Sequence, residues 1–255
     1  FFFPAWIDEN GYDFVAAVGM FDPFALPNTY AIPNLHVDYV PSKIPINFGF
    51  WRSTGAFHNS FALESALDEV AYAGGRDSYE FRRGLLIDRP RALLVLDRVA
   101  ELSNWGKAPA GLFQGISFTH YLETFQAQVV EVSVSKRGKI KVHKITCVAD
   151  CGQVFNSHIA KQQLEGAILY GLTAALKGEI NVKNGQIVQS NFDDYPMLKL
   201  KDTPEINVNL MESHEAPGGL GEAGTPLIGP AVANAVFAAT GKRVRRLPIR
   251  PKDLV

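Results

Sequence analysis

Glu222 is the only charged residue between Pro217 and Ala239, and it lies in the glycine-rich stretch Gly219-Leu220-Gly221-Glu222-Ala223-Gly224. Glycines let a backbone approach a ligand closely and adopt positive φ. A carboxylate held in such a loop is suited to general-base catalysis if it is aimed at a substrate. The alternative is a tight turn that carries a solvated glutamate, since most surface carboxylates have no special role.

The same glycine loop, Gly219 to Gly224, also resembles a dinucleotide-binding fingerprint. That fingerprint needs a strand directly before the glycines, a helix opening inside them and an acidic residue about 20 positions later. Here Pro226 and Pro230 follow, and they predict that the helix begins only at Pro230. The region where the acidic residue should lie is occupied by the basic run Lys242 to Arg246. Nucleotide binding through this loop is therefore the weakest alternative.

Two other polar residues have types and surroundings that suit a ligand. Arg52 lies immediately before the first clear helix, where a guanidinium could hold a phosphate or an oxyanion. The alternative is an arginine that stacks on Trp51 as ordinary packing. Gln163 lies on a small-residue face of a predicted helix, and its amide both donates and accepts hydrogen bonds. The alternative there is a core glutamine bonded to backbone.

The cysteines and histidines give no comparable signal. Cys147 and Cys151 are too few for a disulfide framework or a zinc ribbon, so we expect buried free thiols. None of the six histidines is spaced as a metal ligand, and no serine occupies a nucleophile-elbow sequence.

The composition describes an ordinary globular chain. It has 255 residues, 47% of them hydrophobic and 20% charged, with a formal net charge of −1. A chain with so little net charge has no global basic field for binding nucleic acid. No apolar run approaches the length that spans a membrane. Because the chain opens on Phe1 and an apolar run, we interpret it as the interior of a longer protein.

Apolar periodicity and capping residues predict helices and strands in blocks. A first helix is expected after Arg52, with apolar periodicity over 63–71 and a stop at Gly74-Gly75. Further helices are expected over 77–84, 90–102, 157–176 and 230–241. Strands are expected over 12–18, 35–40, 130–135 and 140–142, and an Asn184-Gly185 turn predicts a hairpin between 179–182 and 186–190. Blocks of helices and strands, rather than regular alternation, favour the α+β class, with mixed sheets and packed helices. We treat 1–255 as one region, with its candidate subdivision near 104–111.

Taken together, these stretches resemble the molybdenum-cofactor-binding subunit of the isoquinoline 1-oxidoreductase and membrane-bound aldehyde dehydrogenase group. This group is a branch of the xanthine oxidase, or molybdenum hydroxylase, family. The resemblance covers nearly the whole chain and is specific because several motifs occur together. They are Trp51-Arg52-Ser53, Asp77 to Arg83, Asp150-Cys151-Gly152, Gln163-Leu164-Glu165-Gly166, Gln189 to Phe192, Gly218 to Glu222, and Ala231 to Ile249.

The resemblance implies a role for each candidate residue. Glu222 matches the family's active-site general base next to molybdenum. Arg52 and Gln163 match residues that bind the molybdopterin, and Gly221 would provide close backbone approach. The cofactor would be molybdopterin, as such or as its cytosine dinucleotide. Its dithiolene holds the metal, so the resemblance implies no metal ligand from this polypeptide.

The resemblance also implies a reaction and partners. The enzyme would oxidise an aldehyde or an N-heteroaromatic compound with oxygen from water and pass electrons to iron–sulfur clusters on a partner subunit. Family subunits are much longer, so this chain would be the carboxy-terminal part and need the amino-terminal half as a second partner. A non-catalytic assembly or binding domain that keeps the fold is the alternative from another class. The group is often exported, which implies a periplasmic or membrane-associated location, with the cytoplasm as the other option.

Overall fold

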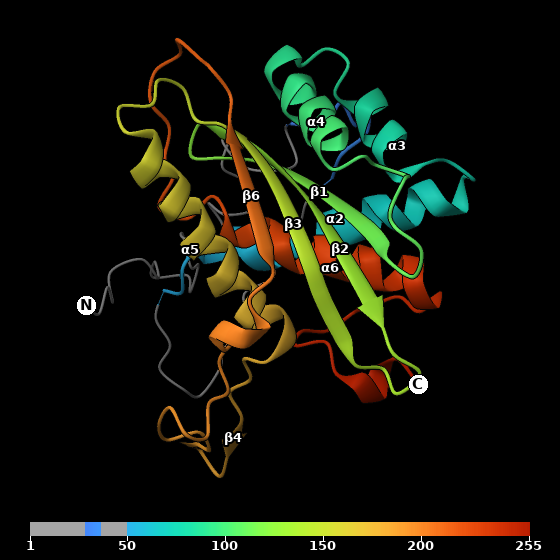
Figure 1. Ribbon diagram of the computed structural model, residues 1–255, viewed down its shortest axis with the longest axis vertical. Helices are drawn as coiled ribbons and strands as arrows, with labels where there is room; N and C mark the ends of the chain where they lie inside the picture. The colour runs from blue at the N-terminus through green and yellow to red at the C-terminus, as the bar shows by residue number, and fades with distance from the viewer. Residues whose placement is uncertain (1–28, 37–49) are drawn as a thin grey trace.

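The structure is a computed structural model that describes residues 29–36 and 50–255 (Figure 1). The strand expected over 12–18 lies outside the described residues, as does most of that expected over 35–40. Five helices lie within the described residues: α2 (Thr54–Ala73), α3 (Ser78–Leu85), α4 (Pro90–Leu102), α5 (Ser157–Leu176) and α6 (Thr225–Thr240). Two short 3-10 helices are η3 (Leu200–Asp202) and η4 (Pro251–Asp253).

A four-stranded sheet is the centre of the described structure. Its order is β1 (Phe113–Tyr121), β2 (Thr124–Val134), β3 (Ile140–Asp150) and β6 (Glu205–Leu210). The first three strands form an antiparallel meander, and β6 pairs with β3 in parallel, so the sheet is mixed. The short strands β4 (Val182–Lys183) and β5 (Gln186–Ile187) form the hairpin expected at Asn184-Gly185, although with fewer residues than predicted.

Helices cover both faces of the sheet (Figure 1). Alternate residues of a strand point to opposite faces, and here apolar residues are buried on both faces. Ile116 and Phe118 of β1 pack with α4 in one core cluster. Val130 and Val132 of β2 pack with α5 and α6 in another cluster. Because α4 and β1 share the first cluster, residues on either side of 104–111 contribute to one core.

The helix α6 lies unusually close to the sheet. A Cβ added to Gly115 of β1 would lie 2.2 Å from the carbonyl oxygen of Ala231 in α6. Ser117, two residues along the same face, donates a hydrogen bond from its Oγ to the Leu227 carbonyl, at 2.9 Å. Only glycine fits at position 115, and this close approach fixes α6 and the loop that precedes it.

A fully buried ion pair joins α2 to α3. Arg82 Nε lies 2.9 Å from Glu64 Oε2, and both side chains are inaccessible to solvent. Burial alone would lower the pKa of Arg82, but the negative charge of Glu64 raises it above its ordinary range. Glu64 also accepts hydrogen bonds from the Tyr30 hydroxyl and the backbone N–H of Phe118. The carboxylate is thus fully partnered, as a buried charge must be.

The helices α3, α4 and α5 agree closely with the ranges expected for them, but one helix start was wrong. The helix α2 begins at Thr54, directly after Arg52 as expected, and its first half buries small residues, such as Gly55 and Ala56, that give little apolar periodicity. The helix α6 begins at Thr225, so Pro226 takes the favourable first-turn position and Pro230 lies inside the helix. Because α6 is buried from Thr225 to Val236, packing overrides the breaking tendency of Pro230.

We expect Glu64→Gln to destabilise the fold by about 3–5 kcal/mol, because it leaves the Arg82 guanidinium buried without a counter-charge. Urea unfolding followed by circular dichroism measures this loss. Glu101→Gln is the control, since Glu101 pairs with Arg98 at the exposed surface and should change the unfolding midpoint little. Equal effects of the two variants would contradict the importance of the buried pair.

Candidate functional site

The glycine loop that contains Glu222 is held between the β1–β2 turn, the end of β3 and α5. The Gly219 N–H donates to the Leu122 carbonyl at 2.7 Å, and the Gly218 N–H donates to the Cys151 carbonyl at 2.8 Å. Thr124 Oγ1 donates to the Gly219 carbonyl at 2.8 Å. Backbone hydrogen bonds to two strands therefore place the loop at one end of the sheet.

The glycines of this loop differ in whether the structure leaves room for a side chain. A Cβ added to Gly218 would lie 2.7 Å from the Glu123 carbonyl oxygen, and one added to Gly224 would lie 2.8 Å from Ala167 Cβ. At these two positions, packing leaves no room for a side chain. Gly221 is exposed, and its nearest neighbour would be Gln163 Nε2 at 3.9 Å. Among the described residues, the space beside Gly221 is therefore open, which suits close approach by another molecule.

Glu222 is half-buried and its side chain is oriented by a tyrosine. The Tyr121 hydroxyl, at the end of β1, lies 2.8 Å from Glu222 Oε2 and donates a hydrogen bond to it. The same hydroxyl lies 3.2 Å from Thr54 Oγ1, in the first turn of α2. Ser53 Oγ donates to the main-chain carbonyl of Glu222 at 3.1 Å. The carboxylate is thus held by Tyr121 at the end of β1, and the main chain of Glu222 is held by Ser53 just before α2.

Arg52 and Gln163 meet at a single acceptor beside Glu222. Arg52 Nε donates to the Gly221 carbonyl at 2.7 Å, and Gln163 Nε2 donates to the same oxygen at 3.2 Å. The Arg52 guanidinium also lies over the Tyr170 ring, at 5.9 Å from its centroid. Arg52 thus stacks on Tyr170, and Gln163 bonds to backbone from an exposed position rather than from the core. Three sequence segments therefore converge, as the site hypothesis requires.

The backbone is strained next to Arg52. Ser53 has φ 79° and Thr54 has φ 42°, so two consecutive non-glycine residues are left-handed. This conformation is uncommon, and for a β-branched residue such as Thr54 it is an outlier. Backbone strain of this kind is concentrated at functional sites, where neighbouring contacts maintain it. The hydrogen bonds from Ser53 and Thr54 are such contacts.

Sequence reasoning missed Tyr121, Ser53 and Thr54. Tyr121 ends β1, a strand for which no range was expected, and no motif distinguishes it. Ser53 and Thr54 stand beside Arg52 in the sequence, but their types alone predict capping rather than left-handed backbone. Only the structure brings the tyrosine to Glu222.

The arrangement leaves donors available for a ligand. Arg52 uses Nε on Gly221, and a guanidinium carries further N–H groups on its two Nη atoms. The Gln163 amide has a second N–H and a carbonyl oxygen beyond the bond it makes. Such groups suit phosphate and the polar edge of a heterocycle.

The glycine loop lacks the structural context of a dinucleotide-binding fingerprint. The first turn of α6 is buried, and no strand directly precedes the loop.

Known proteins are similar to this chain in sequence. The family described as the molybdopterin cofactor-binding domain matches residues 101–204. The beta subunit of isoquinoline 1-oxidoreductase from Brevundimonas diminuta is 35% identical over 227 residues, which is 87% of this chain and 29% of that protein. Residues 101–204 thus belong to the molybdopterin cofactor-binding domain family. The matched range contains Gln163 but neither Arg52 nor Glu222.

Other relatives of this chain are also oxidoreductases by name. The membrane-bound aldehyde dehydrogenase of Gluconacetobacter polyoxogenes is 35% identical over 228 residues, 81% of this chain and 30% of that protein. One subunit of nicotinate dehydrogenase from Pseudomonas putida is 30% identical over 239 residues, 83% of this chain and 20% of that protein. The chain thus spans about three tenths or less of the length of these relatives.

Solved structures show the fold. The aldehyde oxidoreductase of Desulfovibrio desulfuricans aligns with a TM-score of 0.65 at 15% identity, over 80% of this chain and 41% of that one. The aldehyde oxidoreductase of Desulfovibrio gigas aligns over the same shares with a TM-score of 0.60. Together with the mixed sheet and packed helices, this likeness confirms the predicted α+β class of a molybdenum-cofactor-binding domain.

The described residues contain neither a group of side chains that could hold a metal ion nor a helix that could span a membrane. No three or more histidine, cysteine or acidic side chains there gather closely enough to hold a metal ion. No helix in the same residues has the length and apolar character needed to cross a bilayer. Both predicted free thiols are buried there, and burial raises the pKa of Cys147 to about 12.

The two kinds of glycine can be separated by substitution. We expect Gly224→Ala to destabilise the chain by about 1–3 kcal/mol, because the added methyl overlaps Ala167. Gly221→Ala should leave the unfolding midpoint almost unchanged, because nothing lies within van der Waals contact of its new Cβ except Gln163. Thermal unfolding of both variants measures the difference, and a large loss in Gly221→Ala would contradict this division.

Proposed function

We propose that this chain forms one wall of the molybdenum-cofactor site in a molybdenum hydroxylase that oxidises an aldehyde or an N-heteroaromatic compound. Family membership supports the cofactor, and the names of the relatives support the two substrate classes. The observation that carries the proposal is the convergence of Arg52 and Gln163 on the carbonyl next to Glu222.

Arg52 and Gln163 would hold the cofactor, as molybdopterin or its cytosine dinucleotide. The Arg52 Nη groups suit a phosphate, and the Gln163 amide suits the donor and acceptor edge of the pterin. Gly221 leaves open space for the approach. When bound, the cofactor supplies a two-electron redox centre and an oxygen that comes from water. Shared hydrogen bonding to the Gly221 carbonyl keeps both donors in register with Glu222.

Glu222 would act as the general base. Oxidation of an aldehyde to an acid adds one oxygen from water and releases two electrons and two protons. Because Oε2 accepts the Tyr121 hydrogen bond, Oε1 is the oxygen that would take up a proton. The half-buried position limits hydration of the carboxylate. The Tyr121 bond orients the carboxylate, and the Ser53 bond holds the main chain that carries it.

The complete enzyme would need partners. Electrons would leave through iron–sulfur clusters on a partner subunit, and the rest of the molybdenum subunit would close the site. Two of the relatives are named as subunits, which supports a multi-subunit assembly. The name of the membrane-bound relative supports a membrane-associated or periplasmic location.

We expect Glu222→Gln, made in the full subunit with its partners, to lower kcat by about 10²–10⁴-fold without loss of cofactor, since the amide cannot accept the proton. Steady-state kinetics measures turnover, and elemental analysis measures molybdenum per subunit. Glu212→Gln is the matched control, because this exposed glutamate lies ten residues earlier in the connection between β6 and α6. Retained turnover would overturn the role of Glu222, whereas molybdenum-free wild-type complex would overturn the cofactor assignment.

Tyr121→Phe tests how the base is held. The phenylalanine ring keeps the shape of Tyr121 but cannot donate to Glu222 Oε2, so the carboxylate loses the bond that orients it. We expect a smaller loss of kcat than in Glu222→Gln, with molybdenum content unchanged. Tyr79→Phe, which removes a hydroxyl bonded to Asp97 on the far helices α3 and α4, is the control. A kcat equal to that of the unaltered enzyme would show that Tyr121 does not position Glu222.

A further inference from the structure

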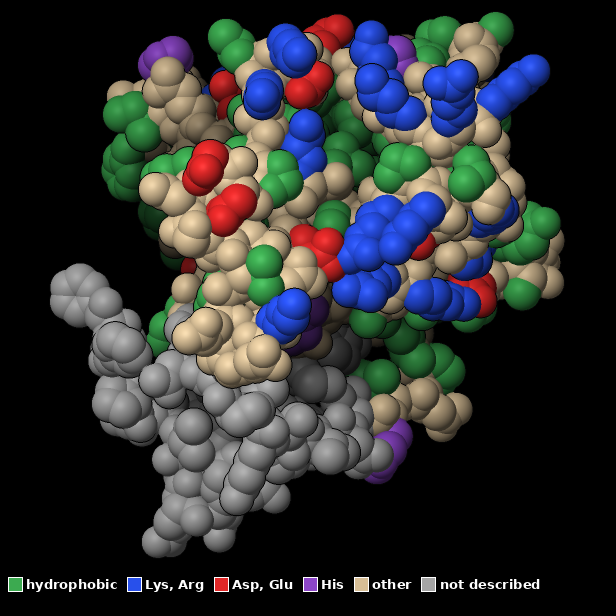
Figure 2. All heavy atoms as spheres, turned by 90° about the horizontal axis from the view of Figure 1, so that it is seen from below, with side chains coloured by type: hydrophobic (Ala, Val, Ile, Leu, Met, Phe, Trp, Pro, Cys, Tyr) green, Lys and Arg blue, Asp and Glu red, His purple; other side chains and the backbone are tan. Residues whose placement is uncertain are grey.

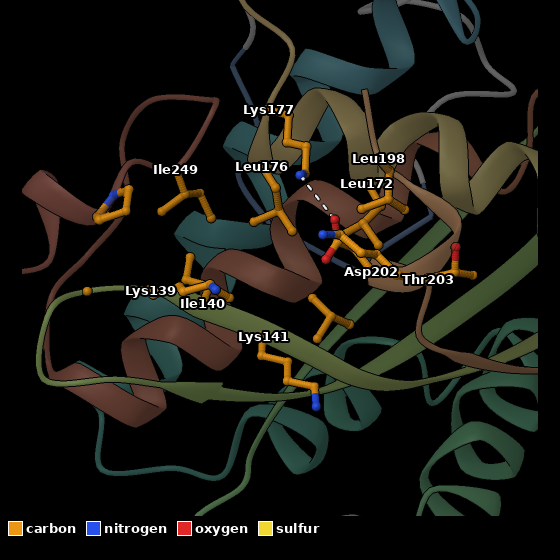
Figure 3. A pocket seen from close by; sticks show the side chains of 14 residues that line it. Lys139, Ile140, Lys141, Leu172, Leu176, Lys177, Leu198, Asp202, Thr203 and Ile249 are labelled. Carbon is orange, nitrogen blue, oxygen red and sulfur yellow. Dashed lines mark hydrogen bonds and ion pairs between the residues drawn. The ribbon is translucent and has the colours of Figure 1, made fainter. Parts of the chain in front are cut away.

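A second hollow, the lysine cavity, lies at the opposite end of α5 from Gln163. It has a volume of about 320 Å³ and lies between the β2–β3 hairpin, the last turns of α5 and η3 (Figure 3). Leu172 of α5 is nine residues from Gln163, which places it about 13 Å further along the helix axis. The lysine cavity is therefore separate from the Glu222 site.

The floor of the lysine cavity is apolar. Leu172 and Leu176 of α5 face Ile140 on the hairpin and Leu198 before η3 (Figure 3). All four belong to or pack against the core cluster that includes α6. An apolar ligand group placed here would bury hydrocarbon surface of both the ligand and the protein.

The rim is cationic. Four lysines line it, against a single carboxylate, Asp202; they are Lys139, Lys141, Lys177 and Lys201. Lys177 Nζ lies 3.5 Å from Asp202 Oδ2, so the negative charge of Asp202 balances the positive charge of Lys177 (Figure 3). The other three lysines make no ion pair within the described residues. Lysine stems cover apolar surface while the ammonium groups stay at the water boundary.

The strand β3 is open along this cavity. It pairs with β6 only from Lys144 onward, while the residues from Ile140 to His143 pair with β2 alone. The chain before β6 leaves β3 and forms η3 instead, and the cavity occupies the space between them. Seen from this lower end, Lys and Arg side chains predominate over acidic ones on much of the described surface (Figure 2). Such a field raises the local concentration of anions.

We propose that the lysine cavity binds a small organic anion, a carboxylate carried on a short apolar body. The carboxylate would lie beside Lys139 and Lys201, and the apolar body would contact the leucines of α5. Ligand sites span about 300–1,000 Å³, so this cavity matches a small ligand rather than a large cofactor. The inference is independent of the chemistry proposed for Glu222, since it uses none of those residues.

Octanoate is the probe, and isothermal titration calorimetry of the chain is the measurement. We expect one saturable site, with 1-octanol binding more weakly because it lacks the charge. The double variant Lys139→Gln/Lys201→Gln should weaken octanoate binding by roughly three- to tenfold, as expected for two solvent-exposed charges. Thr203→Phe, which places a ring in the cavity and keeps every lysine, should abolish binding.

The control is Lys136→Gln/Lys183→Gln, which removes the same charge from exposed positions outside the cavity. Its octanoate affinity should match that of the unaltered chain, and thermal unfolding verifies that all variants are folded. Absence of saturable octanoate binding, or equal weakening by the two double variants, would overturn the proposal. In that case the lysines serve to prevent pairing at the exposed edge of β3.

Discussion

The buried carboxylate of Glu64 is the contact on which the architecture depends. Glu64 lies on α2, and its carboxylate accepts hydrogen bonds from Arg82 of α3 and from the N–H of Phe118 in β1. The main-chain carbonyl of Glu64 accepts a further hydrogen bond from Asn234 of α6. Four elements that are distant in sequence thus share one residue. Since an unpaired buried charge costs several kcal/mol, these elements can adopt only arrangements that satisfy it. The contacts of Glu64 therefore fix the position of α2 relative to the sheet and α6.

The candidate site is a consequence of that arrangement. Arg52 and Ser53 lie at the start of α2, and Glu222 lies just before α6, so the contact between the two helices brings them together. The carbonyl of Gly221 then becomes a common acceptor for Arg52 and Gln163. Strained backbone at Ser53 and Thr54 is maintained by these contacts. The site is therefore built from connections between elements, not from one contiguous motif.

The helix α5 connects two chemically different regions. Its amino-terminal half presents Gln163 to the glycine loop. Further along, Ile228 and Thr225 of α6 leave no room for a side chain at Gly171. The last turns of α5 form the apolar floor below the lysines. Close packing at Gly171, between the two regions, makes α5 a rigid support for both. This geometry explains how one domain can hold two ligand-sized features without overlap.

The sequence by itself determined the local elements with strong signals. Apolar periodicity and the Asn156 cap define α5, alternation defines β2 and β3, and Asn184-Gly185 defines a turn. It also indicated Glu222, Arg52 and Gln163, because their neighbours match a family pattern. It did not show that Pro230 lies inside α6, since the close packing of small residues there leaves no periodic signal. Only the tertiary structure decided that Tyr121 orients Glu222, because a hydrogen bond between residues 101 positions apart depends on how sheet and helices pack.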